Sequence, residues 1–345
     1  MSRFAALIVA LFALALVGAA CGDDDESSAG GDEESAAGGE GEVRDVTVML
    51  NWTPNAHHAG LYLAEANGWF DEAGIDLTIV EPALDVGVEA AVADGAADIG
   101  FAQAESILPA RAAGVDVVAV ATLLPVNDSV LMGLAADGVD GPGSLAGLTY
   151  GGFGGALETE LISALVECGG GDPADVTFVE VGNVDYLAGI EQDRFDVVWV
   201  FEGWDALRAS ELAGADIATI AFEDNLDCIP NWYTPLALTS QALIDEDPEL
   251  VSDFLEIMSR GYDAVVADPA SGAEALTDAV PEADADLVSL AVDYYAPRFI
   301  TGDRFGEMDA DTWNGFAEFL VGAGILEELG DVDAAWTNDL LPEAG

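Results

Sequence analysis

The sequence predicts an α/β protein of two lobes, with the second lobe inserted into the first, a hinge between them and a ligand cleft at the hinge. Short apolar runs rich in β-branched residues alternate with amphipathic helical segments, which is typical of parallel sheets covered by helices. Loop-rich stretches at residues 127–143 and 224–230 interrupt this alternation twice. We expect the chain to cross between lobes there, and lobes joined by two short crossings can close on a ligand.

The first predicted strand, residues 46–50, is apolar and β-branched, and it ends at the polar, proline-containing turn 51–55. A helical pattern follows from Ala59 and ends at Gly68. This turn therefore lies at the carboxyl end of a strand, which is where open α/β sheets bind small ligands. The next elements are expected as strands at 75–80, 99–102 and 117–124, a helix at 86–94, and a helix that opens at Gln103.

The second lobe is expected to begin with strands at 130–135 and 148–150, the latter joined to a helix at 156–167 by the glycine-rich segment 151–155. Its other elements are strands at 177–181, 197–201 and 217–221 and helices at 186–192 and 204–213. A strand at 236–239 returns to the first lobe, and helices follow at 248–267, 271–279, 285–295 and 311–320. The predicted lobes are residues 44–128 with 232–345, and residues 129–231.

The N-terminal residues have the features of an export signal. Residues 1–20 combine a basic start, an apolar stretch and small residues before Cys21, as in a signal peptide. A single spanning helix is the alternative, because about 17–25 apolar residues cross a bilayer. The ending Gly18-Ala19-Ala20-Cys21 resembles a bacterial lipobox, which would make Cys21 a lipid-bearing N-terminus. Residues 21–43, rich in Gly, Ser and acids, are expected to form a disordered tether outside the cell membrane.

The charge balance excludes some classes of partner. The chain has 66 acidic and 8 basic residues, a formal net charge of −58, and all its basic residues are arginines. Such a field repels nucleic acid and anionic membrane surfaces, so we expect neither as a partner, with the lipid as the sole link to the membrane. The charge fits a saline habitat or a surface kept soluble by repulsion. We expect a monomer.

Cysteine and histidine patterns give no sign of a metal centre. Besides Cys21, the chain contains Cys168 and Cys228, which can pair outside the cytoplasm, but the sequence leaves that bond open. Because there is neither a CxxC motif nor a His/Cys cluster, we expect no metal and no cofactor.

Several aromatic residues lie in turns or at strand ends rather than in periodic apolar runs. They are Trp52, Trp204, Trp232 and Tyr233. Flat rings at a cleft suit a planar ligand, since stacking contributes about 1–3 kcal/mol per ring in base-stacking cases. Packing in the core or between lobes is the alternative for each of them. Trp69, Trp199, Trp313 and Trp336 fit helix or strand packing.

Polar candidates accompany these rings. Glu202 follows the apolar strand 197–201, where a buried acid needs a partner. A carboxylate accepts two hydrogen bonds and matches an amino group beside a ring nitrogen. The alternative is an acid that caps or stabilises the following helix. Segment 151–155 can hold an anion at a helix start or form a tight turn. His57 and His58 can contact a ligand or lie at the surface.

The segment LNWTPNAHHAGLYLAEANGWFDEAGIDLTIVEP (residues 50–82) resembles the opening of binding proteins for thiamine's pyrimidine precursors. These are receptors of ABC importers, related to sulfonate-binding proteins and to the fungal thiamine-pyrimidine synthase. The resemblance extends through YGGFGGALETELISAL, FEGW and IPNWYTPLALTS, over roughly residues 45–300. It implies the type II periplasmic binding protein fold, a permease partner, and a substituted aminopyrimidine as ligand, with riboflavin or another planar heterocycle as the alternative.

The resemblance also implies pyrimidine contacts by Asn51, Trp52, His58, Glu202, Trp204 and Tyr233, with segment 151–155 lining the cleft. Together with the residues singled out from the sequence, the ligand-binding candidates are Asn51, Trp52, His58, Gln103, Gly152, Phe153, Glu202, Trp204, Trp232 and Tyr233. Trp52 would stack on the pyrimidine and Glu202 would pair with its aminopyrimidine edge. The fungal synthase holds pyridoxal phosphate on a lysine and has a cysteine-rich motif, and this chain has neither, so we expect no enzymatic activity. Arg111, Arg194 and Arg208 fall outside these motifs, which disfavours a sulfonate ligand.

Overall fold

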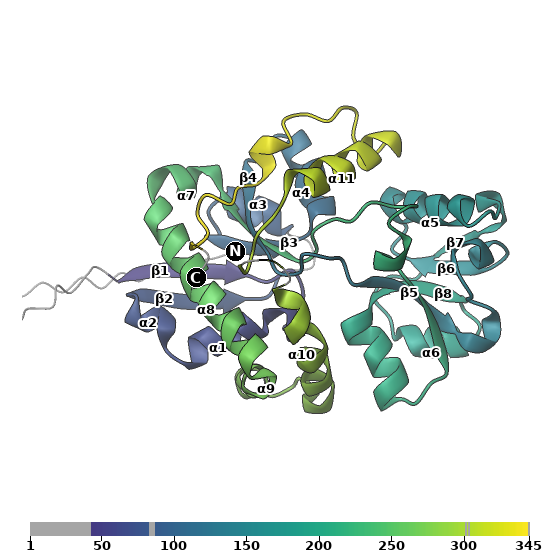
Figure 1. Cartoon of the computed structure of the whole chain (residues 1–345), viewed down its shortest axis with the longest axis horizontal. Coiled ribbons are helices and arrows are strands. Elements are labelled where there is room, and N and C mark those ends of the chain that lie inside the picture. The colour runs from purple at the N-terminus through teal and green to yellow at the C-terminus, as the bar shows by residue number, and fades with distance from the viewer. Residues whose placement is uncertain (1–42, 83–86, 301, 303, 344–345) are drawn as a thin grey trace, which may run out of the picture. The chain divides into compact units, whose positions relative to one another are not determined.

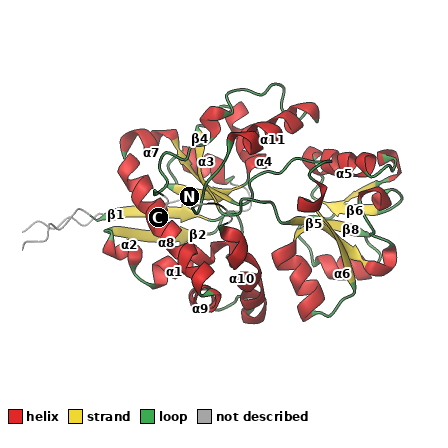
Figure 2. Cartoon of the chain, in the orientation of Figure 1, coloured by secondary structure: helices red, strands yellow, loops and turns green. Residues whose placement is uncertain are grey.

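The computed structural model describes residues 43–82, 87–300, 302 and 304–343. They form two five-stranded sheets, with strand orders β2-β1-β3-β10-β4 and β7-β6-β8-β5-β9 (Figure 1). In Figure 2, helices flank the strands of both sheets. The predicted signal peptide, Cys21 and the tether up to residue 42 lie outside the described residues. Among the described helices, none is both long and apolar enough to cross a membrane.

The first sheet is built from strands whose alternate side chains enter two different cores. Its strands are β1 (Arg44–Met49), β2 (Ile75–Val80), β3 (Ile99–Ala102), β4 (Val117–Thr122) and β10 (Leu236–Ser240). Phe101 faces one core and Ala102 the other, as the period of two in a strand requires. The first core lies under α1 (Ala59–Ala66), α8 (Pro248–Ala267), α9 (Pro269–Ala279) and α10 (Ala285–Phe299). The second lies under α3 (Val88–Ala93), α4 (Ala104–Ala112) and α11 (Ala310–Gly322).

The second sheet follows the same rule. Its strands are β5 (Ser129–Leu134), β6 (Thr149–Gly152), β7 (Thr177–Glu180), β8 (Val197–Phe201) and β9 (Ile217–Ala221). Leu131 packs with the buried face of α5 (Ala156–Cys168), while Val130 and Met132 pack on the opposite side with Ile190 of α6 (Tyr186–Glu191). Figure 1 shows α5 and α6 on opposite sides of this sheet. Two short helices, α2 (Trp69–Glu72) and α7 (Gln241–Glu246), complete the regular elements.

Both sheets are mixed, not parallel as predicted. β10 runs antiparallel to β3 and β4, and β5 runs antiparallel to β8 and β9, whereas the remaining pairs are parallel. Parallel neighbours need a crossover connection, usually a helix. β5 and β10 are entered directly from the crossings, with no such helix, so each enters its sheet from the opposite end. The return of residues 236–239 to the first sheet is confirmed.

Three other local predictions differ from the structure. The glycine segment is shorter than expected, because Gly151 and Gly152 belong to β6. The helix expected at 204–213 is wound as two π-helical segments, Glu202–Ala206 and Arg208–Leu212. The helix expected from Val86 begins at Val88, and Val86 itself is outside the described range.

The two crossings between the sheets are tied together by one side chain. Asn231, in the second crossing, accepts a hydrogen bond from the Asn127 backbone N–H at 3.0 Å through its Oδ1. Its Nδ2 donates to the Pro125 carbonyl at 2.9 Å. Both sheets belong to one compact unit, Glu42–Gly345. The division into lobes at 128/129 and 231/232 stays a prediction.

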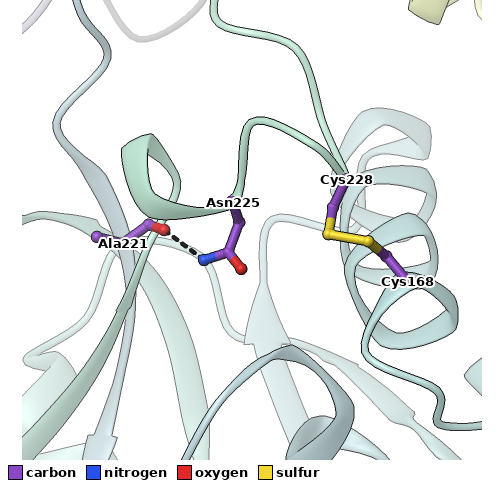
Figure 3. The surroundings of a disulfide bond; sticks show 4 residues. All are labelled: Cys168, Ala221, Asn225 and Cys228. Atoms are coloured by element: carbon purple, nitrogen blue, oxygen red, sulfur yellow. Dashed lines mark hydrogen bonds between the residues drawn. A yellow bond between two sulfur atoms is a disulfide. The ribbon is translucent and has the colours of Figure 1, made fainter.

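A disulfide bond joins Cys168, at the end of α5, to Cys228, in the second crossing (Figure 3). Their Cα atoms are 5.5 Å apart, and 60 positions of sequence separate them. Beside it, the Asn225 side chain donates a hydrogen bond to the Ala221 carbonyl at 2.7 Å. The pairing that the sequence left open is therefore present, and it fixes the second crossing to the helix that covers the second sheet.

Candidate functional site

The turn after β1 is organised around a buried histidine. His58 Nε2 lies 3.0 Å from Asn51 Oδ1, and the Asn55 backbone N–H donates to His58 Nδ1 at 3.3 Å. Since Nδ1 accepts, Nε2 carries the hydrogen and donates to Asn51. Burial lowers the pKa of His58 to about 3, so the ring is neutral. Both ring nitrogens are occupied in this structure, and His58 holds Asn51 in place, while the ligand contact expected of His58 stays a prediction.

Asn51 is partly exposed and Trp52 is exposed in this turn. With Oδ1 bonded to His58, the Asn51 side chain presents its amide N–H groups, for which the described residues offer no recorded partner. The Trp52 side chain is 46% exposed, although large apolar rings are normally buried. An exposed indole beside amide donors is a surface able to bind a flat polar molecule.

The matching turn of the second sheet follows β6 and contains Phe153, which is 55% exposed. Gly152 precedes it, and a Cβ there would lie 2.5 Å from Tyr150 and from Glu158, so only glycine fits. The Glu158 carboxylate accepts backbone N–H groups of Phe153 at 2.9 Å and Gly155 at 3.0 Å. These donors already face an internal carboxylate, so the geometry is that of a tight turn and not an anion site.

Glu202 begins the first π-helical segment, directly after β8. One carboxylate oxygen, Oε2, accepts a hydrogen bond from the Tyr294 hydroxyl at 3.2 Å. Within the described part of the chain, no partner is recorded for Oε1. Trp204, two residues later, is partly buried and packs on the core under α10. Glu202 thus occupies the first turn of a helical segment, and it keeps one acceptor free.

His57, the neighbour of His58, contacts the strand that leads into Glu202. The His57 ring contacts the edge of Phe201, the last residue of β8, with ring centroids 5.3 Å apart. It also lies 4.3 Å from the Tyr295 ring of α10. Because Phe201 directly precedes Glu202, and His58 bonds Asn51, this contact links the helical turn Ala56–His58 to the residue before Glu202. Burial, and secondarily the neighbouring His58, lower the pKa of His57 to about 3.

Asp128 is a site-adjacent acid that sequence reasoning missed. It lies buried at the end of the first crossing and accepts the Tyr295 hydroxyl at 2.6 Å and the Gly203 backbone N–H at 3.4 Å. Burial raises the pKa of Asp128 to about 7, and these hydrogen bonds offset part of that effect. A run of polar residues, Asn127-Asp128-Ser129, inside an apolar region was the available signal.

Trp232 and Tyr233 are buried and packed in this structure, so their expected ligand roles stay predictions. Trp232 is 1% exposed, and its ring is stacked on Phe316 with centroids 4.9 Å apart. Tyr233 is 2% exposed, and its hydroxyl donates to Asp309 Oδ2 and accepts the Asp309 backbone N–H, both at 2.8 Å. Neither ring has a free face in this structure. Among the candidate rings, Trp52 and Phe153 are exposed and Trp204 is partly exposed.

Gln103 caps α4 at the carboxyl end of β3, and its side chain is partly exposed. Nearby, burial raises the pKa of Glu105 to about 7. The structure records no contact that joins Gln103 or Phe153 to the Asn51–Glu202 region, so their ligand roles stay predictions. Two surface hollows among the described residues, one between α4 and residues 325–331 and one beside α8, contain none of the predicted site residues. No group of three or more metal-ligating side chains occurs in the described chain.

The family model described as NMT1/THI5 like matches residues 55–272 of the chain. The chain belongs to the NMT1/THI5-like family. That match begins in the turn after β1 and includes the β8–Glu202 region, so it covers most of the candidate residues.

Curated relatives of this NMT1/THI5-like chain carry both binding and enzyme names. It is 28% identical to a formylaminopyrimidine-binding protein of Halalkalibacterium halodurans, over 82% of this chain and 86% of the relative. It is 25% identical to a 4-amino-5-hydroxymethyl-2-methylpyrimidine phosphate synthase of Legionella pneumophila, over 86% and 92%. It is 26% identical to the riboflavin-binding protein RibY of Chloroflexus aurantiacus, over 87% of each.

Solved structures establish the fold of the family member. The alkanesulfonate-binding protein SsuA of Xanthomonas axonopodis pv. citri superposes with a TM-score of 0.64 at 15% identity, covering 86% of this chain and 99% of that one. SsuA of Escherichia coli gives a TM-score of 0.65 at 12% identity, covering 88% and 94%. The chain therefore has the periplasmic binding protein fold, as the sequence predicted. At these identities, the likeness concerns the fold alone.

Proposed function

We propose that this chain is the extracytoplasmic binding subunit of an ABC importer and that its ligand is a thiamine pyrimidine precursor of the hydroxymethylpyrimidine or formylaminopyrimidine type. The observation that supports the proposal is the contact between His57, the neighbour of the histidine that bonds Asn51, and Phe201, the residue before Glu202. A planar aminopyrimidine needs a flat apolar face, a donor for its ring nitrogens and an acceptor for its amino group. Trp52, Asn51 and Glu202 supply these three features.

The relative named a formylaminopyrimidine-binding protein supports the same ligand class. The test is isothermal titration of the purified folded part with hydroxymethylpyrimidine, formylaminopyrimidine, thiamine and riboflavin. We expect saturable binding of a pyrimidine, with a negative heat-capacity change from burial of the ring. The Glu202→Gln variant keeps the size of the side chain and removes its charge, so it should bind more weakly. Absence of binding to every pyrimidine would reject the proposal.

A riboflavin-type ligand is the second candidate, because RibY is similar over 87% of each chain. The isoalloxazine ring also stacks on an exposed indole, so the titration must include it. Tight riboflavin binding without pyrimidine binding would establish this alternative.

An enzymatic role is the third candidate, since several relatives are named pyrimidine phosphate synthases. The chain contains no lysine, so a Schiff base between a lysine and a cofactor aldehyde cannot form. We therefore expect no turnover and no absorbance from a lysine-bound aldehyde after addition of pyridoxal phosphate. Formation of a phosphorylated pyrimidine would overturn the assignment as a binding protein.

The membrane attachment is proposed from the sequence, in which Cys21 follows an apolar leader. We expect wild-type protein to fractionate with membranes and to incorporate a labelled fatty acid. The Cys21→Ala variant should do neither, while its ligand binding is unchanged. Equal labelling of both proteins would place any lipid elsewhere.

A further inference from the structure

Two consecutive tyrosines near the end of α10 each donate a hydroxyl to an acid from the junction with the second sheet. Tyr294 donates to Glu202 Oε2 at 3.2 Å, and Tyr295 donates to Asp128 Oδ2 at 2.6 Å. The two rings lie edge to face, with centroids 5.1 Å apart. Although the two tyrosines are adjacent, the Tyr295 contact is buried and fixes backbone, whereas the Tyr294 contact is partly exposed and orients a side chain.

The Tyr295–Asp128 contact fixes backbone. Both residues are buried, and besides the contacts to the Asp128 side chain, the Asp128 carbonyl accepts the Glu202 N–H at 3.1 Å. The same acid therefore holds the backbone at the start of the π-helical segment. Gly203 lets α10 approach closely, because a Cβ there would lie 2.4 Å from the Tyr295 ring and 2.5 Å from the Tyr294 ring. The Asp128 contacts therefore fix the position of the Glu202 backbone.

The Tyr294–Glu202 contact orients a side chain. Arg298 stacks its guanidinium 3.8 Å from the centre of the Tyr294 ring and donates to the Tyr294 carbonyl at 3.0 Å, which keeps the ring in place. The hydroxyl engages Oε2 alone. A carboxylate has about four acceptor positions, so Oε1 stays available while Oε2 is held. Glu202 is partly exposed, so Oε1 can be reached from outside.

We propose that Tyr294 is a positioning residue for ligand selection: by holding Oε2 of Glu202, it presents Oε1 as a fixed acceptor for an amino group of the ligand. This inference rests on the proposed function and narrows its substrate class. The amino group of an aminopyrimidine offers two N–H donors to such an acceptor. The N–H of an isoalloxazine or other imide ring lies between two carbonyl oxygens, which a carboxylate repels. The site therefore favours amino-substituted heterocycles over imide-type ones.

The test is a double-mutant cycle with a matched control. Tyr294→Phe removes one hydroxyl and keeps the ring under Arg298, and Tyr295→Phe makes the same change one position later. By titration with formylaminopyrimidine, we expect Tyr294→Phe to raise Kd about five- to tenfold, which lies within the range of an ordinary hydrogen bond. In the Glu202→Gln background, the same change should alter Kd less than about twofold, because residues that act through each other are not additive. Tyr295→Phe should lower Tm, and its effect on Kd should be smaller than that of Tyr294→Phe.

Three results would overturn the inference. Tighter binding by Tyr294→Phe would mean that the hydroxyl competes with the ligand. An equal loss in the wild-type and Glu202→Gln backgrounds would mean that Tyr294 does not act through Glu202. Equal weakening of riboflavin binding and of formylaminopyrimidine binding by Tyr294→Phe would contradict the selectivity. A gain in riboflavin affinity at least as large as the loss in formylaminopyrimidine affinity would support it. If wild-type protein binds no pyrimidine at all, the proposed function fails and this inference with it; binding with additive losses removes the inference alone.

Discussion

The Tyr295 hydroxyl lies 2.6 Å from Asp128 Oδ2 and joins α10 to the end of the first crossing, across 167 positions of sequence. Oδ1 of the same carboxyl is buried and has no partner among the described residues. An acid in this environment is more stable in its neutral form than in its charged form. The protonation state of Asp128, beside the candidate site, therefore makes the stability of the fold depend on pH.

Asp128→Asn should change the pH dependence of stability. The pKa of Asp128 is raised from its ordinary 3.8 to about 7 in the folded chain, so its contribution is complete below pH 3.8 and is lost as the pH rises through 7. Such a shift corresponds to roughly 4 kcal/mol at most, at 1.36 kcal/mol per unit. We expect the variant to gain stability relative to wild type between pH 4 and pH 7, measured by urea unfolding at fixed ionic strength. A constant difference over this range would contradict the assignment. Asp245→Asn, at an exposed position of α7, is the control.

Trp52→Ala should weaken ligand binding without destabilising the fold. The exposed indole makes little contribution to the core, and loss of a stacking ring costs about 1–3 kcal/mol, or roughly five- to 150-fold in Kd. Titration measures the affinity and thermal unfolding the stability. Phe178→Ala removes another partly exposed ring, on β7, and should leave Kd unchanged. Equal affinities of Trp52→Ala and wild type would exclude stacking on this ring.

The Cys168–Cys228 disulfide should contribute measurably to stability. A cross-link that closes a loop of 60 positions restricts the unfolded chain by about 4 kcal/mol in the chain-entropy model. We expect Cys168→Ser/Cys228→Ser to unfold at lower urea than wild type. Reductant should destabilise wild type and leave the double variant unchanged. If reductant affects both equally, its action lies outside this bond.

Salt should stabilise the folded chain. With a formal net charge of −58, self-repulsion opposes compaction, and screening shortens from about 10 Å at 0.1 M to about 3 Å at 1 M ionic strength. We expect Tm to rise steeply with NaCl over this range. Sucrose at equal osmolality separates screening from solute exclusion, since it should raise Tm by less. A Tm independent of salt would show that the acids are already compensated in the folded state.

The strands at residues 75–80, 99–102, 197–201 and 217–221 were predicted with their observed bounds. These are runs of apolar or β-branched residues with breakers on each side, so local sequence determines them. The direction of β5 and β10 was not predictable locally, because it depends on how the chain enters each sheet. Neither was the π-helical winding after Glu202, next to a glycine that packs against Tyr295.

The candidate site was predicted in part. Asn51, Trp52 and Glu202 occupy strand-end positions that local sequence identifies. The burial of Trp232 and Tyr233 depends on Phe316 and Asp309, which lie more than 70 positions away. Asp128 was missed for the same reason, since its partner Tyr295 is even more remote in sequence. Sequence also cannot show that both ring nitrogens of His58 are bonded within the chain.

Asn231 has a mechanical consequence for the connection between the sheets. Its side-chain amide bonds Pro125 and Asn127 to the second crossing, so two hydrogen bonds hold the two connecting segments together. Shearing one segment past the other breaks both hydrogen bonds, whereas flexing the two together breaks neither. We therefore expect any relative motion of the sheets to be a bend about a single axis, with twisting suppressed.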